Sequence, residues 1–240
     1  MKHVSTTFAD TDWTDFCGED ATYTDCTFPS AQFTGTCFAG ATFQHCRFPA
    51  ARFARADLAE TRFEDCSFTL GQEGTTFLLA ALRTARFLRC DLSLARFDRC
   101  ELFDITMDQC TLRGARFHKA DFSHAYSRKT VSTRATFRAC NLELADLAEA
   151  RLPGCDLTGS RLREADLSGA DLTGATLRDC DLFQADLTRA RLAEADLRGA
   201  EISGLNLLHL ASFAGLRIDA AQQHLLLAAL GVEIETEPTR

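Results

Sequence analysis

Large apolar residues recur at every fifth position along most of this chain, and Ala or Cys usually stands two positions before each of them. The large residues, mostly Phe in the first half and Leu in the second, run from Phe28 to Phe68, from Leu82 to Phe122 and from Phe137 to Leu207. A period of five fits neither the 3.6 residues of a helical turn nor the alternation of a strand. The pattern therefore excludes one straight helix and one straight strand.

A chain that turns a corner after every five residues does satisfy this period. Each five-residue side then points one large and one small side chain inward and exposes the other three. Stacked coils bury the large residues in a continuous column, and the backbone pairs with the coils above and below at a spacing of about 4.8 Å. The chain has 240 residues, of which 46% are hydrophobic, so one such core is enough and two domains are not required.

The repeats resemble those of the pentapeptide repeat family, whose consensus is Ala-(Asp/Asn)-Leu-x-x. Two successive repeats read Ala165-Asp166-Leu167-Ser168-Gly169 and Ala170-Asp171-Leu172-Thr173-Gly174. The resemblance extends from about Phe8 to about Arg217. It implies an all-β fold, a right-handed quadrilateral β-helix with four sides per coil. We expect this β-helix over residues 1–217, with loops at about 69–76 and 123–134, and a short α-helix in a dimerisation module over 218–240.

The eleven cysteines either build a metal or redox site or serve as small buried side chains. Four five-residue sides make one coil, which stacks Cys26, Cys46 and Cys66; Cys90 and Cys110 form a second group, and Cys100, Cys140 and Cys180 a third. In-register side chains on parallel coils point the same way, which suits disulfide geometry poorly. No Cys-x-x-Cys and no zinc-type His spacing occurs. We expect reduced, buried cysteines, no metal and no cofactor.

The five-residue period breaks twice, and breaks in a solenoid are where specific function usually enters. Between Phe68 and Phe77 the frame shifts as four inserted residues would shift it. Between Phe122 and Phe137 the frame is kept, but two large residues are missing, so this segment is either two irregular sides or a longer loop. The first break contains Leu70, Gly71, Gln72, Glu73, Gly74 and Thr75. The second contains His124, Tyr126, Ser127, Arg128, Lys129, Thr130, Val131 and Arg134.

Two loops in these relative places resemble one branch of the family, the Qnr proteins, as do the segments 87–97 and 112–117 between the loops. Qnr proteins protect DNA gyrase and topoisomerase IV from fluoroquinolones. The resemblance implies that both loops bind the partner, DNA gyrase or topoisomerase IV. It also implies a homodimer through the C-terminal module.

The C-terminal segment supports the same resemblance. Asp219 can cap a helix whose third residue is Gln222, and Gly231 can end it. Val232 to Ile234 then alternates like a short strand. An open solenoid end needs a cap, so this module is either a cap alone or a cap with a dimer interface. The expected interface residues are Leu225, Leu226, Leu227, Leu230, Val232 and Ile234.

Charge is uneven along the chain. The net charge is −8, so direct binding of nucleic acid is not expected. Residues 1–30 and 141–201 are acidic, whereas residues 31–135 hold fifteen Lys or Arg against eleven Asp or Glu. An acidic face is expected from Asp156, Asp166, Asp171, Asp181, Asp186 and Asp196. These carboxylates either imitate the phosphates of DNA or are simply the solvated consensus residue.

Three functions fit this sequence. The first is a topoisomerase-binding protein that protects its target from fluoroquinolones; the second is a self-immunity protein against another gyrase poison; the third is a generic interaction scaffold. No nucleophile elbow, phosphate loop or metal motif occurs, so we do not expect an enzyme. No apolar run is long enough to span a membrane and no secretory signal is visible, so a cytoplasmic location is expected.

Overall fold

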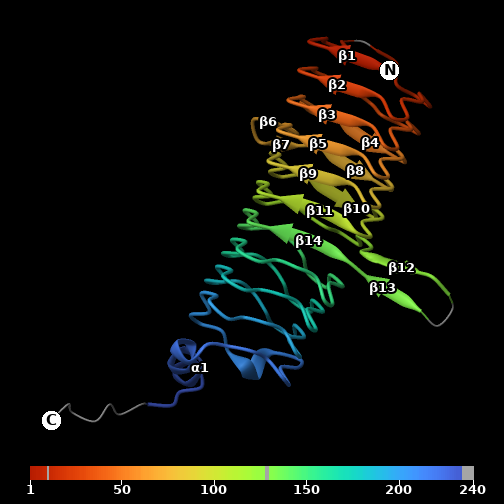
Figure 1. Cartoon of the computed structure of the whole chain (residues 1–240). Helices are drawn as coiled ribbons and strands as arrows, with labels where there is room; N and C mark the ends of the chain where they lie inside the picture. Colours follow the sequence, from red (N-terminus) through yellow and green to blue (C-terminus); the bar gives the residue numbers. More distant parts are fainter. Residues whose placement is uncertain (10, 128–129, 234–240) are drawn as a thin grey trace.

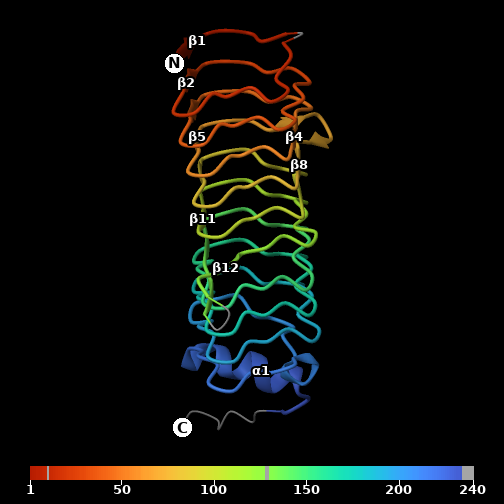
Figure 2. The same cartoon turned by 90° about the vertical axis from the view of Figure 1, so that its right-hand side faces the viewer.

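The chain winds into one solenoid whose coils stack from the N-terminal to the C-terminal end (Figure 1). The computed structural model describes residues 1–9, 11–127 and 130–233. The fold is the predicted right-handed quadrilateral β-helix, mostly β, with one short α-helix at its C-terminal end. Figure 2 shows the same stack from the side, with α1 (Gln223–Ala229) lying across its C-terminal end.

Four ladders of parallel pairing run along the solenoid, and we number the faces that carry them in chain order. Face 1 holds a seven-stranded parallel sheet, continued beyond its last strand by bridges from Thr136 through Asp156 and Asp196 to Arg217. The strands of face 1 are β1 (Lys2–Val4), β2 (Thr22–Thr24), β3 (Thr42–Gln44), β5 (Arg62–Glu64), β9 (Arg86–Leu88), β11 (Ile105–Asp108) and β14 (Ala135–Arg138).

Face 3 holds a second parallel sheet. On faces 2 and 4, single β-bridges join each coil to the next. The strands of face 3 are β4 (Arg52–Ala54), β8 (Thr76–Leu78) and β10 (Arg96–Asp98), and bridges extend it through Arg116, Asp146, Asp166 and Asp186. Face 2 runs through Thr27, Arg47, Ser67, Asp91, Thr111, Asn141, Arg161, Asp181 and Glu201. Face 4 runs through Cys17, Cys37, Asp57, Ala81, Glu101 and Asp121, and again from Arg151 through Asp171 and Arg191 to Ser212.

Each five-residue side has the same internal design. Phe43, at the large position, and Ala41, two residues before it, are fully buried, while the residues between and after them face outward. Two residues after the large one the backbone takes a left-handed conformation, as at His45 with φ 53°. This residue turns the corner, because the chain cannot continue as a strand with positive φ.

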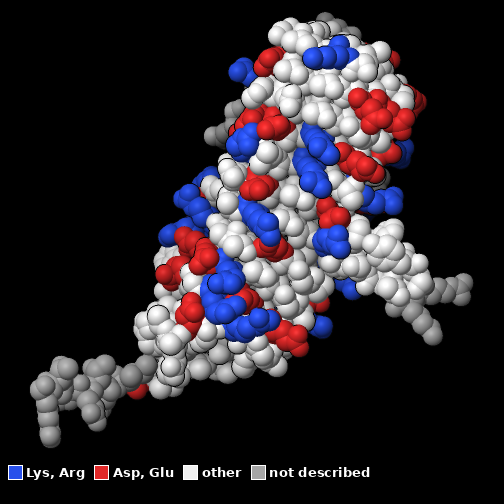
Figure 3. Space-filling model, viewed as in Figure 1, with Lys and Arg blue, Asp and Glu red and all other residues white. Residues whose placement is uncertain are grey.

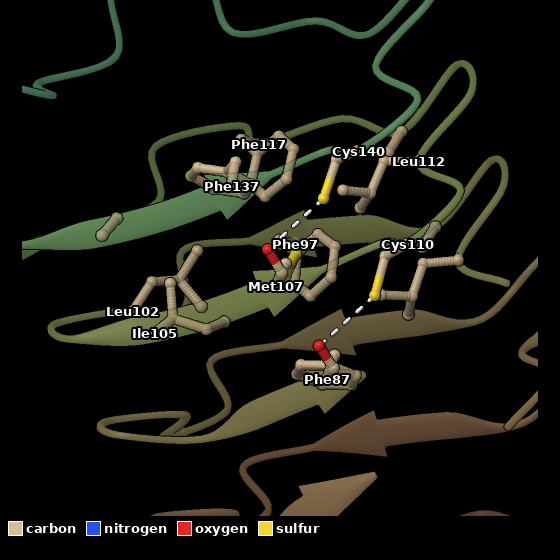
Figure 4. Close-up of a cluster of buried hydrophobic side chains, with 14 of the residues drawn as sticks. Phe87, Phe97, Leu102, Ile105, Met107, Cys110, Leu112, Phe117, Phe137 and Cys140 are labelled. Carbon is tan, nitrogen blue, oxygen red and sulfur yellow. Dashed lines mark hydrogen bonds between the residues drawn. The ribbon is translucent and has the colours of Figure 1, made fainter. Parts of the chain in front are cut away.

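The core is a stack of rings and aliphatic side chains at the coil spacing. Phe77 and Phe97 on neighbouring coils stack in parallel with 4.9 Å between ring centroids, and Phe97 stacks on Phe117 at the same distance. Figure 4 shows Phe97 and Phe117 in one cluster of buried side chains with Leu102 and Ile105. The large residues therefore form the continuous buried column that the period predicts.

The stacks predicted for Cys26, Cys46 and Cys66 and for Cys90 and Cys110 are present, but the third predicted group, Cys100, Cys140 and Cys180, is wrong. All eleven are free, and nine are buried. Cys140 and Cys180 continue the column of Cys90 and Cys110, because the insertions displace the later cysteines from the regular spacing; Ser160 fills one place in it. The column comprises Cys26, Cys46, Cys66, Cys90, Cys110, Cys140, Ser160 and Cys180, whereas Cys100 lies under face 4.

Each interior thiol of this column has a backbone partner. Cys110 Sγ donates to Phe87 O and Cys140 Sγ to Met107 O, both at 3.4 Å (Figure 4). Burial raises the pKa of Cys180 to about 12, so its thiol stays protonated at neutral pH. The interior cysteines therefore act as small hydrogen-bonded core residues.

Coil length varies at three places. A regular coil consists of four five-residue sides, as in the pairing of Thr22 with Thr42, but Arg62 pairs with Arg86 and Ile105 with Ala135. These longer coils contain insertions of four and ten residues. A third insertion, of one residue, precedes the pairing of Arg191 with Ser212.

The one-residue insertion corrects the predicted end of the repeats. Leu207 does not continue the column of large residues; it begins a short 3-10 helix, η1 (Leu207–His209), and is only partly buried. Asn206 caps η1 through its side chain, which accepts from Leu208 N at 2.9 Å. The repeat resumes one position later, with Ser212 paired to Arg191.

The predicted C-terminal helix caps the last coil. A 3-10 turn, η2 (Ala220–Gln222), leads into α1. The buried Gln222 accepts from Asp219 N and donates to Leu197 O at 2.8 Å and to Ala200 O at 2.7 Å. Gly231, with φ 76°, ends the helix as predicted. Val232 and Glu233 form no strand, and Ile234 lies outside the described residues.

Candidate functional site

The first insertion is a small hairpin at the corner between faces 2 and 3. It consists of the antiparallel strands β6 (Thr69–Leu70) and β7 (Glu73–Gly74), joined through Gly71 with φ 61°. Leu70, Gln72 and Glu73 are exposed. Thr75, which was predicted to belong to the loop, is fully buried and donates to Phe68 O and Phe48 O. The projecting part, loop 1, is therefore residues 70–73.

The second insertion is a longer hairpin at the corner between faces 4 and 1. Its strands, β12 (Ser123–Ala125) and β13 (Val131–Thr133), pair antiparallel, which decides between the two readings of this segment in favour of a loop. Tyr126 and Val131 are 63% and 57% exposed. Arg128 and Lys129 lie outside the described residues. We call residues 123–134 loop 2.

Contacts at its base hold loop 2 against face 4. His124 lies 5.2 Å from the ring of Phe103 and 4.7 Å from that of Tyr126, between ring centroids. Arg134 pairs with Asp104 at 3.4 Å. A groove of about 370 Å³ lies beside these rings, lined also by Asp57 and Glu60. Loop 2 thus joins an aromatic cluster to an acidic surface.

The two loops project from opposite corners of the square cross-section. Figure 1 shows β6 and β7 on one side of the solenoid and the β12–β13 hairpin on the other. A second groove, of about 540 Å³, lies where the ladder of face 4 breaks between Asp121 and Arg151, and both residues line it. A partner that touches both loops must therefore wrap around faces 1 and 2 or around faces 3 and 4.

The six aspartates predicted to form an acidic face do not share a face. Residues five apart lie on successive sides of the square, so Asp156 and Asp196 lie on face 1, Asp181 on face 2, Asp166 and Asp186 on face 3, and Asp171 on face 4. Arginines also pair with three of them, as Arg138 does with Asp156. The intermixed blue and red atoms in Figure 3 show such neutralisation over the face in view.

These aspartates have a backbone role instead. Each accepts a hydrogen bond from the backbone N–H two residues later, as Asp166 does from Ser168 at 2.9 Å. Such turns are the usual reason for Asp at a tight bend. Arg198 holds the pKa of Asp196 down to about 2 through its hydrogen bonds to the carboxylate. The structure therefore favours the consensus-residue reading of this position.

Carboxylates gather elsewhere, on face 4 between the N-terminus and loop 2, where Glu101 pairs with Arg83 and Asp104 with Arg134. We call this set the face 4 acidic patch; Arg83 is the only lysine or arginine among the outward residues of that part of the face that the structure describes. The patch comprises Glu19, Asp20, Asp57, Glu60, Glu101, Asp104 and Asp121. Sequence analysis missed it because its members come from different coils and are far apart in the chain. An alignment of the successive coils that allows for the four-residue insertion would have revealed this patch.

The neighbouring face 3 carries the opposite charge over the same coils. Its outward residues between β4 and loop 2 include one acid, Asp98, which pairs with Arg96 at 2.9 Å. The cations of this face 3 basic patch are Arg52, Arg55, Arg96, Arg99, Arg116 and Lys119. The positive excess of residues 31–135 is therefore concentrated on one side of the molecule, next to loop 1.

The residues expected at a dimer interface divide between the cap and the surface. Leu226 is buried against the last coil and Leu225 packs partly on it, so both serve the cap. Leu230 and Val232 are 37% and 47% exposed. Within the described ranges, no group of three or more His, Cys, Asp or Glu is placed to hold a metal, and no helix is long and apolar enough to cross a membrane.

The repeats match a known family. The sequence model for pentapeptide repeats matches residues 31–69, 90–126, 140–179 and 177–209. The chain belongs to the pentapeptide repeat family. A comparison with curated proteins found no match.

Among solved pentapeptide repeat structures, QnrB1, a plasmid-mediated fluoroquinolone resistance protein, is similar over its whole length. The full-length form is 27% identical, with a TM-score of 0.67, and the alignment covers 97% of this chain and 100% of QnrB1. Two trypsin-treated forms have TM-scores of 0.74 and 0.72, at 24% and 26% identity, and each alignment covers 98% of this chain. The Qnr-like resemblance seen in the sequence is confirmed at the level of the fold.

Proposed function

We propose that this protein binds DNA gyrase, topoisomerase IV or both, and protects them from fluoroquinolones without catalysing a reaction. The observation that carries the proposal is the end-to-end likeness to QnrB1 together with two hairpins inserted into an otherwise regular solenoid. Hairpins that interrupt a repeat serve binding more often than stability, because the coils pair without them. The proposal requires a cytoplasmic protein.

Loop 2 and the face 4 acidic patch together supply the main contact in this proposal. The exposed Tyr126 and Val131 provide apolar surface for a partner to bury, and aromatic residues are typical anchors of interfaces. The acidic patch beside them attracts a basic, DNA-binding surface and speeds association, with an effect that weakens as salt rises. A DNA-like role therefore belongs to face 4 and not to the six aspartates of the second half.

Dimerisation through the C-terminal module also belongs to the proposal. Leu230 and Val232 leave exposed apolar surface beside α1, and the exposed Leu208 and Phe213 add to it at the same end of the solenoid. A second copy would cover this surface through the same patch, as two-fold interfaces do. The acidic patches of the two copies would then lie toward the far ends of the rod.

Binding of immobilised gyrase and topoisomerase IV at two salt concentrations tests the proposal. Replacing Glu19, Glu60 and Glu101 of face 4 by Gln should lower the association rate and its salt dependence. A matched variant with Asp146, Asp166 and Asp186 of face 3 changed to Asn alters net charge equally and keeps the oxygen that caps each turn. It should bind like the wild type. Equal losses in both variants would refute the assignment to face 4, and no binding by the wild type would refute the function.

A further inference from the structure

Two cysteines depart from the pattern of the other nine. The nine occupy the small inward position two residues before a large one, and all are buried. Cys17 and Cys37 stand one residue later in the repeat, on face 4, where side chains point outward. Cys17 is exposed and Cys37 is partly exposed. They have no place in the core, so a structural role as small buried side chains does not explain them.

Backbone hydrogen bonds fix the two cysteines directly opposite each other on neighbouring coils. Cys37 N donates to Phe16 O at 2.8 Å, and Cys37 O accepts from Gly18 N at 2.7 Å, so the parallel pairing brackets Cys17. Paired residues on adjacent parallel strands lie about 4.8 Å apart and point to the same side. The two thiols therefore extend side by side from the surface at about that spacing.

This spacing suits a bridging ion better than a disulfide. A disulfide needs sulfurs about 2.05 Å apart and Cβ atoms about 3.8 Å apart, which the ladder would have to bend to reach. Two sulfurs on opposite sides of one ion, with metal–sulfur bonds of about 2.3 Å, are about 4.6 Å apart, close to the ladder spacing. Thiolates select soft ions such as Cu(I).

We propose that Cys17 and Cys37 bind one soft monovalent cation of the Cu(I) class in linear, two-coordinate geometry. Two metal–sulfur bonds form, the two thiols release two protons to solvent, and no electron is transferred. Glu19 and Asp57 lie on the same face, and the bound cation offsets one of the two negative charges that deprotonation of the thiols adds beside them. The bound ion would tie the first coil, which has a neighbour on one side only, to the second.

The surroundings of Cys37 also oppose the competing oxidation. Burial, and the nearby Cys17, Asp57 and Glu19, raise the pKa of Cys37, so its thiol stays protonated at neutral pH. A protonated thiol is a poor nucleophile in disulfide exchange. A metal ion displaces the proton, so the affinity for the ion should rise with pH.

Anaerobic titration with Cu(I), delivered as its bicinchoninate complex, tests this site. The wild type should bind one equivalent of Cu(I) tightly, and Cys17→Ser and Cys37→Ser should each lose this tight binding. Their affinity for Cu(I) should fall by about 10²- to 10⁴-fold, because the second thiol acts as an intramolecular ligand. Cys155→Ala, which removes one buried thiol and keeps the outward pair, should retain the equivalent. Thermal unfolding of the metal-free variants checks that all three fold.

Three results would overturn the proposal. One is an unchanged Cu(I) equivalent in either single serine variant, which would place the ion elsewhere. Another is loss of the Cu(I) equivalent in Cys155→Ala, which would assign the ion to the interior thiols. The third is rapid formation of a Cys17–Cys37 disulfide with oxidised glutathione in the wild type, because that would show that the sulfurs are not held at the ladder spacing.

Discussion

Single residues in this fold are constrained most tightly where the chain turns or where two coils touch. Gly154 turns a corner with φ 70°, and a Cβ there would meet open space. Gly74, at the base of loop 1, is different: a Cβ there would collide with the backbone of Leu94 and Ala95 on the next coil. The first glycine is required by its dihedral angle, and the second by the close packing of loop 1 on the solenoid.

These two glycines give a prediction that separates strain from packing. Gly154→Ala should lower the free energy of unfolding by about 1 kcal/mol, the usual penalty for a left-handed non-glycine residue. Gly74→Ala should cost more, about 2–3 kcal/mol, because backbone atoms must move. Urea unfolding of both variants measures the difference. Equal costs would mean that loop 1 does not pack on the next coil.

Asp196 predicts an acid-dependent part of stability. Arg198 lowers the pKa of this carboxyl from 3.8 to about 2, mainly through hydrogen bonds to it, so the folded state favours the ionised form. The stabilisation is therefore complete above about pH 4 and is lost as the pH falls toward 2. Urea midpoints of the wild type and of Asp196→Asn, measured between pH 5 and pH 2, should differ at the higher pH and converge at the lower. A gap that stays constant would contradict this assignment.

At the scale of elements, both loops are additions to a solenoid that closes without them. Removing residues 70–73 restores the five-residue step from Phe68 to Phe77, with Gly74 at the corner. Removing residues 125–134 likewise restores the five-residue step from Phe122 to Phe137. Each excision restores a regular coil of four sides and the register of its neighbours.

We therefore predict that both excised variants fold cooperatively, with unfolding midpoints at or above that of the wild type, because shorter connections lose less entropy on ordering. Removing residues 70–72 provides the control. It leaves one residue too many, so Phe77 can no longer enter the column in register, and this variant should be clearly destabilised. Thermal unfolding by circular dichroism compares the three; similar melting of the control and the in-frame variants would contradict the assigned register.

The C-terminal helix predicts a separation between capping and dimerisation. Leu230→Asp with Val232→Asp places charge on exposed apolar surface, so it should convert a dimer to a monomer without loss of stability. Leu226→Ala should destabilise by about 2–5 kcal/mol, since it empties a buried site against the last coil. Light scattering gives the mass, and urea unfolding gives the stability. A wild type that is already monomeric at high concentration would refute the dimer.

Sequence periodicity predicted these elements well where the signal was local. The side length, the buried column, the four-residue insertion and the helix ending at Gly231 all depend on residues close together in the chain. The errors arose where contacts are distant. The column that joins Cys110 to Cys140 and the one-residue insertion before Ser212 depend on coil length, which the five-residue period does not report.

At the scale of the whole molecule, charge in the middle of the chain is sorted by face. The face 4 acidic patch and the face 3 basic patch occupy neighbouring sides of the same coils, and loop 2 and loop 1 flank them. Counting charge along the sequence averages these two patches into a small positive excess over residues 31–135. The net charge of −8 therefore describes neither side that a partner would meet.

The most direct test of the central claim is DNA supercoiling by gyrase in the presence of ciprofloxacin. The intact protein should restore supercoiling as its concentration rises, whereas the variants lacking residues 70–73 or 125–134, shown to be folded, should restore less, with the larger loss for loop 2. A loopless variant that protects as well as the intact protein would contradict the role of the loops. No rescue by the intact protein would contradict protection from fluoroquinolones and leave other gyrase poisons to be tested.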